Sequence, residues 1–509
     1  MKKLLFSLFA ILAFVACSDD GAGVEEDTTI KIETTEAKIE PNVNSTVIKF
    51  FAAEPWTAEV IITRADDWCS ISPTSGDAGD ATITVTTKTN KSPKKRFAQI
   101  VIKSGETEET IEVTQEESQE KSKILYTSSD GNIVEPTEPR GFDATILSNT
   151  YENGQGVITF SGPITSIGFQ AFDACSSLTS ITIPESVTSI KERAFNGCSS
   201  LTSVTIPDSV TFIGDGAFSA CSSLISITIP EGVTSIEYCT FFSCSSLTSI
   251  TIPDSVNLIG EGAFSGCSSL TSVTIPEGVT SIGDNAFEYC SSLTSITIPD
   301  SVTSIGDRAF VGCRSLISIT IGNGVTSIGD NLFSGCSSLE NVIIGNGVTS
   351  IGGRAFEACS SLTSITLPES VTSIGDGAFY ECRSLTSVTI PDSVTSIGVQ
   401  AFLFCSLTSV TIPDNVTSIG KQVFFGCRSL KSVTIGNGVT SIDDNAFFGC
   451  FNLTSVYCKP KTPPTLGSAD AFDNNVPNRN IYVPTASVDA YKTADGWKKY
   501  ADNITGYEF

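Results

Sequence analysis

A pattern of about 23 residues recurs thirteen times between Gly156 and Asn452. One clear copy, from Ile206 to Thr228, reads Ile-Pro-Asp-Ser-Val-Thr-Phe-Ile-Gly-Asp-Gly-Ala-Phe-Ser-Ala-Cys-Ser-Ser-Leu-Ile-Ser-Ile-Thr. Repeats of about 20 to 29 residues with regularly spaced Leu and Ile are typical of solenoids of leucine-rich coils, in which each coil covers the apolar edge of the next. We therefore predict a solenoid of short parallel strands and short helical turns over residues 156–457. A solenoid offers surfaces rather than an enclosed pocket.

A single coil cannot fold alone. The apolar positions that every copy repeats are, in the copy from Ile206, Val210, Ile213, Ala217, Phe218, Cys221, Leu224, Ile227 and Ile229. Burying them stabilises a coil by roughly 10 to 20 kcal/mol, whereas ordering its backbone costs on the order of 25 to 45 kcal/mol. Stacking must supply the remainder, so we expect these side chains to point inward into one shared core.

Local signals place a strand and turns in each coil. The motif Leu-x-x-Ile/Val-x-Ile predicts the strand, and the Pro that follows ends it because Pro has no N–H for the ladder. In three coils Gly-Asn-Gly replaces the Pro, at 322–324, 345–347 and 436–438, and predicts a turn of another type. Asp215 is a candidate N-cap for a short helical turn on the outer, convex wall.

Composition excludes most catalytic chemistry. The chain of 509 residues has no histidine, so Ser-His-Asp triads, Cys-His pairs and histidine metal sites are not available. Carboxylates that follow the strand-ending Pro, such as Asp208 and Asp254, form no convergent pair, and a solvated turn explains them more simply than shared Ca²⁺. A net charge of −26 repels phosphate backbones. We predict no enzyme, no cofactor, no metal site and no nucleic-acid partner.

The N-terminus has the pattern of a secretion signal. Lys2 and Lys3 precede an apolar run over residues 4–15, which is too short to span a bilayer. Together with Cys17 it resembles a bacterial lipoprotein signal, which implies removal of residues 1–16, lipid attachment to Cys17 and a tether over residues 17–24. The stretch Ser18-Asp19-Asp20 resembles the acidic export tag of Bacteroidetes-type surface lipoproteins. This implies a place on the outer face of the outer membrane, with membrane contact only through the lipid on Cys17; an ordinary secretory signal is the alternative.

Residues 25–115 predict a small β-sandwich. Alternating runs at 82–86, 99–102 and 110–114 are separated by turns rich in Gly, Pro and Ser. The stretch 68–76, Trp-Cys-Ser-Ile-Ser-Pro-Thr-Ser-Gly, the run 96–100, Arg-Phe-Ala-Gln-Ile, and the closing 113–115 resemble the BACON domain of Bacteroidetes surface proteins. The resemblance implies contact with glycan or mucin. Cys69 departs from it, since the family usually has an aliphatic residue there.

Two tryptophans of this segment are candidate sugar platforms, because aromatic faces stack on apolar sugar faces. Trp68 is at a strand end, where a core position is the better interpretation. Trp56 is the candidate glycan-binding aromatic, with an exposed and a core position both open.

Composition shifts give the remaining boundaries. Residues 116–155 combine a charged, apolar-poor hinge with an atypical first cap, which then enters a partial first coil at residues 157–160. Residues 458–509 are the expected C-terminal cap.

The repeats resemble the BspA-like leucine-rich surface proteins, which share Ile-Pro-x-x-Val-Thr-x-Ile-Gly-x-x-Ala-Phe-x-x-Cys-x-x-Leu. The resemblance extends over the whole run of coils. Family members described as adhesins bind host matrix proteins, other bacteria or epithelial cells, which implies a similar role here.

Thirteen of the seventeen cysteines fall on the repeat, and the step from Cys405 to Cys427 is shorter than the others by one residue. Pairing between adjacent coils is sterically possible. We favour free thiols, because the count is odd and a small apolar residue suits the inward position. Cys239 breaks the pattern, on the outer turn, and is a candidate reactive thiol.

Outward strand residues predict a column of hydroxyls on the concave face. A regular surface for a long polymer or a protein is one interpretation, and the suitability of Thr for any exposed strand is the other. The columns are almost free of aromatics, which argues against a carbohydrate cleft there, and residues 340–343 break them. The candidate binding residues are Thr182, Thr205, Thr228, Thr251, Thr274, Thr297, Thr320, Thr366, Thr389, Thr411 and Thr434.

A second candidate surface is apolar. Leu403, Phe425 and Phe448 occupy one position in three successive late coils, directly after the buried Phe. We predict an exposed stripe on the convex wall, with Phe404 and Phe451 close by. It is either covered by the C-terminal segment, which has helical spacing over residues 487–504, or a partner site.

Two functions follow. The first is a surface lipoprotein whose solenoid binds a host or mucin glycoprotein without catalysis. The second is an accessory glycan-binding protein of a polysaccharide-uptake system, in which the sandwich captures polysaccharide and the repeats act as a spacer.

Overall fold

The computed structural model describes residues 30–33, 35–62, 68–90, 94–116, 122–468 and 470–509. The chain divides into two compact units, with the division between Ser118 and Gln119. The predicted signal peptide of residues 1–16, the lipidation site Cys17 and the tether of residues 17–24 lie outside the described residues. Over the described ranges, the helices are all too short or too polar to cross a membrane.

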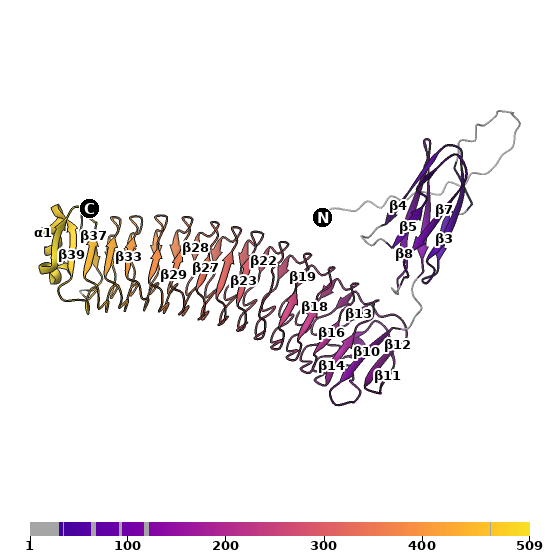
Figure 1. Cartoon of the computed structure of the whole chain (residues 1–509), viewed down its shortest axis with the longest axis horizontal. Coiled ribbons are helices and arrows are strands. Elements are labelled where there is room, and N and C mark those ends of the chain that lie inside the picture. The colour runs from indigo at the N-terminus through magenta and orange to yellow at the C-terminus, as the bar shows by residue number, and fades with distance from the viewer. Residues whose placement is uncertain (1–29, 34, 63–67, 91–93, 117–121, 469) are drawn as a thin grey trace. The chain divides into compact units, whose positions relative to one another are not determined.

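The first unit is a β-sandwich, as the sequence predicts (Figure 1). Its sheets have the strand orders β1-β3-β7-β5 and β2-β9-β8-β4-β6. Alternate residues of β3, Ile48, Phe50 and Ala52, are buried, because successive side chains of a strand point to opposite faces. They share one core with Ile100 and Val113 of the other sheet. The strands are β1 (Lys31–Ile32), β2 (Glu36–Ile39), β3 (Ser45–Ala52), β4 (Trp56–Ile62), β5 (Cys69–Ser72), β6 (Ser75–Gly76), β7 (Gly79–Thr87), β8 (Arg96–Ser104) and β9 (Thr107–Gln115).

An antiparallel cap opens the second unit. It consists of β10 (Lys123–Ser128), η1 (Pro139–Gly141), β11 (Ile146–Glu152) and β12 (Gln155–Phe160). Strand β10 also pairs antiparallel with β14, the first strand of the coils, so the cap covers the open edge of the ladder. Residues 157–160, which we expected to form a partial first coil, therefore belong to the cap sheet.

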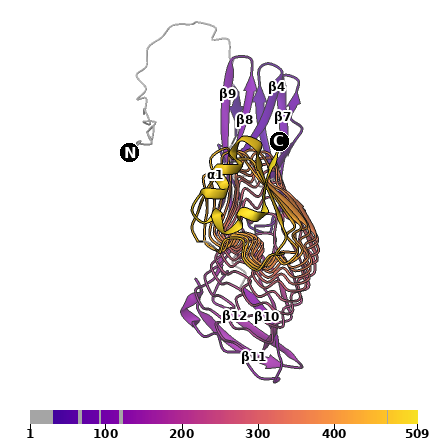
Figure 2. The ribbon, with the colours of Figure 1, turned by 90° about the vertical axis from the view of Figure 1, so that its left-hand side faces the viewer.

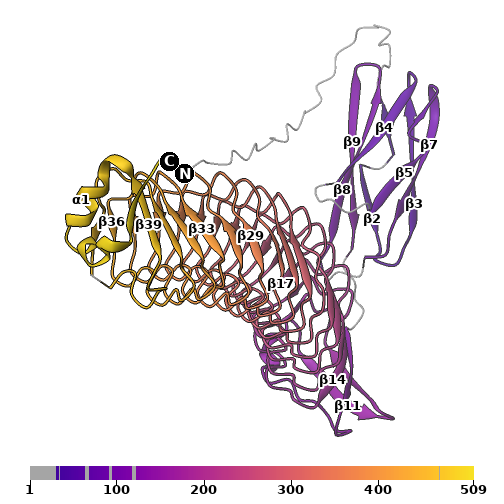
Figure 3. The same ribbon diagram turned by 60° about the vertical axis from the view of Figure 1, so that its left-hand side comes forward.

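Each coil then adds a strand to two parallel columns (Figures 1 and 3). Strands pair in register, so that Thr228 lies beside Thr251 and Ile190 beside Ile213. The first column contains β14 (Leu178–Thr182), β16 (Ser203–Thr205), β18 (Ser226–Thr228), β20 (Ser249–Thr251), the bridge residue Ser272, β23 (Ser295–Ile298), β25 (Ser318–Ile321), β27 (Asn341–Ile343), β29 (Ser364–Thr366), β31 (Ser387–Thr389), β33 (Ser409–Ile412), β35 (Ser432–Ile435) and β37 (Ser455–Cys458).

The second column has two-residue strands. They are β13 (Ser166–Ile167), β15 (Ser189–Ile190), β17 (Phe212–Ile213), β19 (Ser235–Ile236), β21 (Leu258–Ile259), β22 (Ser281–Ile282), β24 (Ser304–Ile305), β26 (Ser327–Ile328), β28 (Ser350–Ile351), β30 (Ser373–Ile374), β32 (Ser396–Ile397), β34 (Ser418–Ile419), β36 (Ser441–Ile442) and β38 (Thr465–Leu466).

The remaining side of each coil is a series of turns, which we call the turn wall; residues 214–222 are one example. Backbone hydrogen bonds join these turns from coil to coil, such as Phe195 N to Ala217 O at 2.8 Å. Two residues of each turn have positive φ, as Gly216 and Ala220 do at 57°. Left-handed residues interrupt a helix before it forms. The helical turn that we expected Asp215 to cap is therefore absent from this coil.

A stack of phenylalanine rings forms the centre of the core. Successive ring centroids lie 5.2 to 5.8 Å apart, and the planes differ by at most 24°. Every coil thus contributes the same ring to one continuous interior, as the energetic argument predicts. The rings belong to Phe172, Phe195, Phe218, Phe241, Phe264, Phe287, Phe310, Phe333, Phe356, Phe379, Phe402, Phe424, Phe447 and Phe472.

The C-terminal residues close the other end. Two strands extend the first column, β39 (Asn480–Pro484) and β40 (Ile504–Tyr507). The segment that connects them contains η2 (Thr485–Ser487), α1 (Val488–Thr493) and η3 (Trp497–Asn503). Helix α1 lies over the end of the coils (Figure 2). Buried Trp497 packs on Phe472 at 5.7 Å, and its Nε1 donates a hydrogen bond to Pro464 O at 2.7 Å.

Candidate binding surfaces

The predicted hydroxyl residues form one line along the first column, and we call this surface the hydroxyl face. Nine of the eleven threonines are exposed, whereas Thr320 and Thr434 are half-buried. Ile343 replaces threonine in β27 and is 63% exposed, so it interrupts the line as expected from residues 340–343.

Hydroxyls of the hydroxyl face differ from those of the neighbouring threonines. Thr248, Thr271 and Thr294 donate hydrogen bonds to backbone carbonyls of the preceding coil at 3.2 to 3.3 Å. For Thr228 and Thr251, which are on the line itself, no hydroxyl partner lies among the described residues. Their hydroxyls are therefore available to a ligand, whereas those of the neighbouring threonines hold coils together.

Sequence reasoning missed the aromatic end of this face. Tyr457 lies beside Thr434, and Tyr482 lies beside Tyr457, so tyrosine continues the threonine line. The two rings stack at 4.8 Å, and Tyr507 meets both at 5.5 Å. The signal was present in the sequence, because Tyr457 follows Thr434 at the spacing of one repeat. Our expectation that the columns are almost free of aromatics does not hold at this end.

The predicted apolar stripe lies on the turn wall but is only partly exposed. Leu403 is 5% exposed, so its prediction as a surface residue is wrong. Phe425 and Phe448 are half-buried and stack at 5.3 Å. Phe404 packs edge-on against Phe425 at 5.8 Å, and both line a hollow together with Leu403. Within the part of the chain that the structure describes, the aromatic side chains of residues 487–504 do not cover the stripe. Trp497 and Tyr500 pack instead on Phe472.

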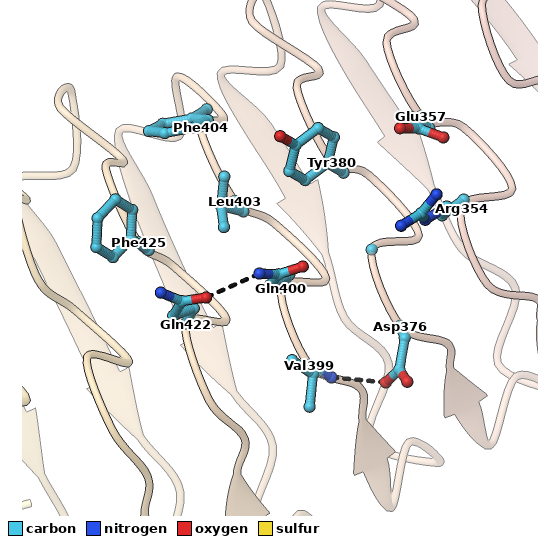
Figure 4. A pocket seen from close by; sticks show the side chains of 11 residues that line it. Arg354, Glu357, Asp376, Tyr380, Val399, Gln400, Leu403, Phe404, Gln422 and Phe425 are labelled. Atoms are coloured by element: carbon cyan, nitrogen blue, oxygen red, sulfur yellow. Dashed lines mark hydrogen bonds between the residues drawn. The ribbon is translucent and has the colours of Figure 1, made fainter. Parts of the chain in front are cut away.

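A cavity of about 550 Å³ lies beside these rings (Figure 4). Arg354, Glu357 and Tyr380 surround one side of it, and Asp376 lies at its edge. The Asp376 carboxylate accepts a hydrogen bond from Val399 N at 2.7 Å. On the opposite side, Gln400 Nε2 donates to Gln422 Oε1 at 2.8 Å. Aromatic rings, amides and charges of both signs thus meet in one hollow, which is a combination typical of ligand sites.

The sandwich offers no tryptophan face. Trp56 is 4% exposed, so its prediction as an exposed aromatic is wrong. The Phe50 ring meets it edge-on at 4.9 Å, and a Cβ on Gly76 would lie 2.7 Å from its Nε1. Glycine is what allows the indole to enter the core. Trp68 is also 4% exposed, and the Arg96 guanidinium lies 5.0 Å from its ring centroid.

Cysteines form a ladder inside the turn wall. The repeat thiols from Cys198 to Cys450 each donate to the carbonyl of a phenylalanine in the preceding coil, as Cys221 does to Phe195 at 3.1 Å. All described cysteines are free, and all except Cys175 and Cys239 are buried. Burial raises the pKa of Cys244 and Cys336 to about 12, and it also raises the pKa of half-buried Cys239. The candidate reactive thiol is therefore a weaker nucleophile at neutral pH than an ordinary cysteine.

Labelling of the native protein with a maleimide is expected to mark Cys239 and Cys175 slowly and the other described cysteines only after unfolding. The physical reason is that the remaining thiols are both inaccessible and protonated. Peptide mass spectrometry would measure the rates. Labelling of Cys267 at the rate of Cys239 would contradict the closed ladder.

Family comparisons agree with this architecture. The family described as BspA type leucine rich repeat region matches three overlapping segments, residues 145–270, 257–376 and 349–479. Together these segments cover more than half of the chain. The chain belongs to this family. Residues 55–116 match the BACON family, described as a putative binding domain. A search of curated proteins gave no match.

Solved structures include other bacterial repeat proteins. A leucine-rich repeat protein from Bacteroides ovatus is 30% identical, with 66% of this chain and 91% of that chain covered and a TM-score of 0.53. A leucine-rich cell surface protein from Faecalibacterium prausnitzii is 33% identical, with 62% and 86% covered and a TM-score of 0.41. BspA-type proteins are typically at the cell surface, and together with the BACON match this indicates a surface binding protein.

Families of this kind are typically non-catalytic. Within the ranges that the structure describes, no group of three or more His, Cys, Asp or Glu side chains is arranged to hold a metal ion. Asp300 and Asp414, two of the carboxylates that follow the strand-ending Pro, accept hydrogen bonds from the backbone N–H of Asn323 and Asn437 in the next coils. These carboxylates have a structural use that requires no cation.

Proposed function

We propose that this BspA-type protein is a lipoprotein of the outer membrane, anchored through Cys17, whose solenoid binds a host or mucin glycoprotein without catalysis. The observation that carries the proposal is the line of exposed threonine hydroxyls without internal partners. Because the line repeats in successive coils on both sides of Ile343, it suits an extended partner that makes many weak contacts.

The alternative, in which the sandwich captures polysaccharide and the solenoid is a spacer, has weaker support. Trp56 and Trp68 are both in the sandwich core. Each unit has its own hydrophobic core, so the two can be prepared and compared separately.

Capture of glycoproteins from host mucus is expected from the full chain and from residues 119–509, but not from residues 25–118. Quantitative mass spectrometry of the retained proteins would measure this. Retention by residues 25–118 alone would favour the alternative. Hydrolysis of a mucin or plant glycan by the purified chain would contradict a non-catalytic role.

Replacement of Thr228, Thr251 and Thr297 by Val is expected to weaken capture about tenfold, because each lost hydrogen bond contributes about 0.5 to 1.5 kcal/mol. Valine retains the shape and the strand preference of threonine. The control replaces Thr248, Thr271 and Thr294, whose hydroxyls bond to the backbone. The control should lower the melting temperature slightly and leave capture unchanged. Equal capture by both variants would exclude the hydroxyl face.

A further inference from the structure

The turn wall contains a second cavity of about 550 Å³. It lies several coils closer to the N-terminus than the cavity beside Tyr380. The two cavities share an arginine and an Asp-Gly pair at equivalent positions of the repeat, whereas their aromatic residues are at different positions. Arg193 corresponds to Arg354, and Asp215 corresponds to Asp376, in each case seven repeats further along the chain. We call them the first groove, around Arg193, and the second groove, around Arg354.

A shared frame builds both grooves. Arg193 and Arg354 occupy left-handed positions, with φ of 55° and 54°, which is unusual for a residue with a long side chain. In the next coil a glycine lies under the arginine. A Cβ on Gly216 would lie 3.6 Å from Arg193 Cγ, and one on Gly377 would lie 3.3 Å from Arg354 Cγ. The arginine stem thus lies against the backbone of this glycine, which has a positive φ of 57° in Gly216 and 61° in Gly377.

This frame occurs only at the two grooves. The sequence Asp-Gly-Ala-Phe follows an Arg-Ala-Phe coil at residues 215–218 and again at residues 376–379, and nowhere else in the repeats. Arg308 occupies the same position in a coil between them, but there Asp330-Asn331 follows in place of Asp-Gly. Its guanidinium pairs with Glu288 at 3.6 Å. Arg308 is therefore a matched control for Arg354.

The charges of the grooves exclude an anionic ligand. The second groove combines Arg354 with Glu357 and Asp376. The first groove likewise has one arginine and two carboxylates, Glu192 and Asp215. Each groove therefore has a net negative charge and repels phosphate, sulfate and carboxylate groups. Guanidinium and carboxylate groups together offer donors and acceptors for neutral hydroxyls.

Aromatic side chains complete both grooves. In the first, Tyr238 is 51% exposed and Phe242 is 40% exposed. In the second, Tyr380, Phe404 and Phe425 are half-buried and follow one another from coil to coil (Figure 4). Rings of this kind cover the apolar C–H face of a pyranose, while the charged frame bonds to its hydroxyls.

We propose that the turn wall carries two grooves for neutral saccharides, built on the same Arg and Asp-Gly frame seven coils apart. At the usual strand spacing of about 4.8 Å, the grooves are roughly 34 Å from each other. A glycan chain or a densely glycosylated surface that reaches both grooves binds with avidity beyond that of either groove. This site lies on the turn wall and is independent of the hydroxyl face.

The test uses the full chain and two probes. Isothermal titration with neutral oligosaccharides of hexose and N-acetylhexosamine is expected to give two sites per chain. Arg354→Ala and Arg193→Ala should each reduce this number to one, and the double variant to none. On an array of the same glycans at high density, each single variant should bind at least about tenfold more weakly, because avidity is lost. Arg308→Ala should match the parent in both measurements.

Several results would overturn the proposal. They are the absence of neutral saccharide binding, a preference for sialylated or sulfated versions of the same glycans, equal losses in Arg308→Ala, or loss of a protein partner from the double variant without any effect on saccharides. The arginines are exposed, so unchanged melting curves are expected for these variants. The hydroxyl-face variant distinguishes the two proposals. Loss of mucus capture with saccharide binding unchanged would support the hydroxyl face alone, and unchanged capture with loss of saccharide binding in the arginine variants would support the grooves alone.

Discussion

The solenoid is expected to unfold when the pH is raised from about 8 to about 10.5. The cause is the buried thiol ladder, since burial raises the pKa of Cys244, Cys336 and Cys450 from an ordinary value of 9.0 to about 12. Above pH 9 the unfolded chain releases thiol protons that the folded chain retains. Unfolding is then favoured by on the order of 1 kcal/mol per thiol for each pH unit.

The sign and the window follow from these values. Below pH 9 the thiols are protonated in both the folded and the unfolded state. They therefore do not make the free energy of unfolding depend on pH, and their contribution to stability is fully present. Between pH 9 and about 12 the stability falls with rising pH, and the many equivalent thiols act together because the coils share one core. Urea unfolding followed by circular dichroism at pH 8, 9 and 10, with a reductant present, would measure the slope.

The matched variant replaces Cys267, Cys290 and Cys313 by alanine. It is expected to be less stable at pH 8, because three small cavities form, but to lose stability less steeply with rising pH. Lysine and tyrosine titration is common to both proteins, so the difference in slope isolates the thiols. An identical slope would show that the ladder does not control alkaline stability.

Truncation of Phe241 to alanine is expected to destabilise the solenoid by about 3 to 5 kcal/mol. The ring is fully buried and stacks on Phe218 at 5.8 Å and on Phe264 at 5.5 Å. Its removal leaves a cavity and breaks the column of rings at one coil. Because coils contact mainly their neighbours, urea melts should show either a lower midpoint or two transitions.

The adjacent residue supplies the control. Phe242 has the same side chain and directly follows Phe241 in the chain, but it is 40% exposed on the turn wall. Phe242→Ala should change the free energy of unfolding by less than about 1 kcal/mol. Equal losses in the two variants would mean that the inward direction of Phe241 is not what stabilises the coil.

The repeat allowed most of the solenoid to be predicted. Its constant period places equivalent side chains beside one another, so the inward set, the threonine line and the turn positions could all be assigned from spacing. The same rule would have placed Tyr457 next to Thr434. The Pro signal that marks the end of the strand in most earlier coils is absent after Tyr457, where Lys459 takes its place.

Other features depend on contacts that spacing does not determine. Trp56 is buried because Gly76 of a neighbouring strand leaves room for its indole. Leu403 is 5% exposed, whereas Phe242, at the same position of the repeat, is 40% exposed. The helical turns predicted for the outer wall require right-handed φ, yet residues such as Gln400 and Gln422 adopt the left-handed region. In each case a neighbour in space, and not the local pattern, decides the outcome.

The strict register of the coils has a genetic consequence. Since each coil meets near-copies of itself on both sides, recombination between repeated gene segments can insert or delete whole coils without placing any side chain against a foreign one. The shortened coil between Cys405 and Cys427, across which Phe402 and Phe424 still stack at 5.4 Å, shows that even a lost residue is absorbed within one turn. A chain with one coil added or removed is therefore expected to keep one continuous core and both terminal caps, and to change in length by about 4.8 Å.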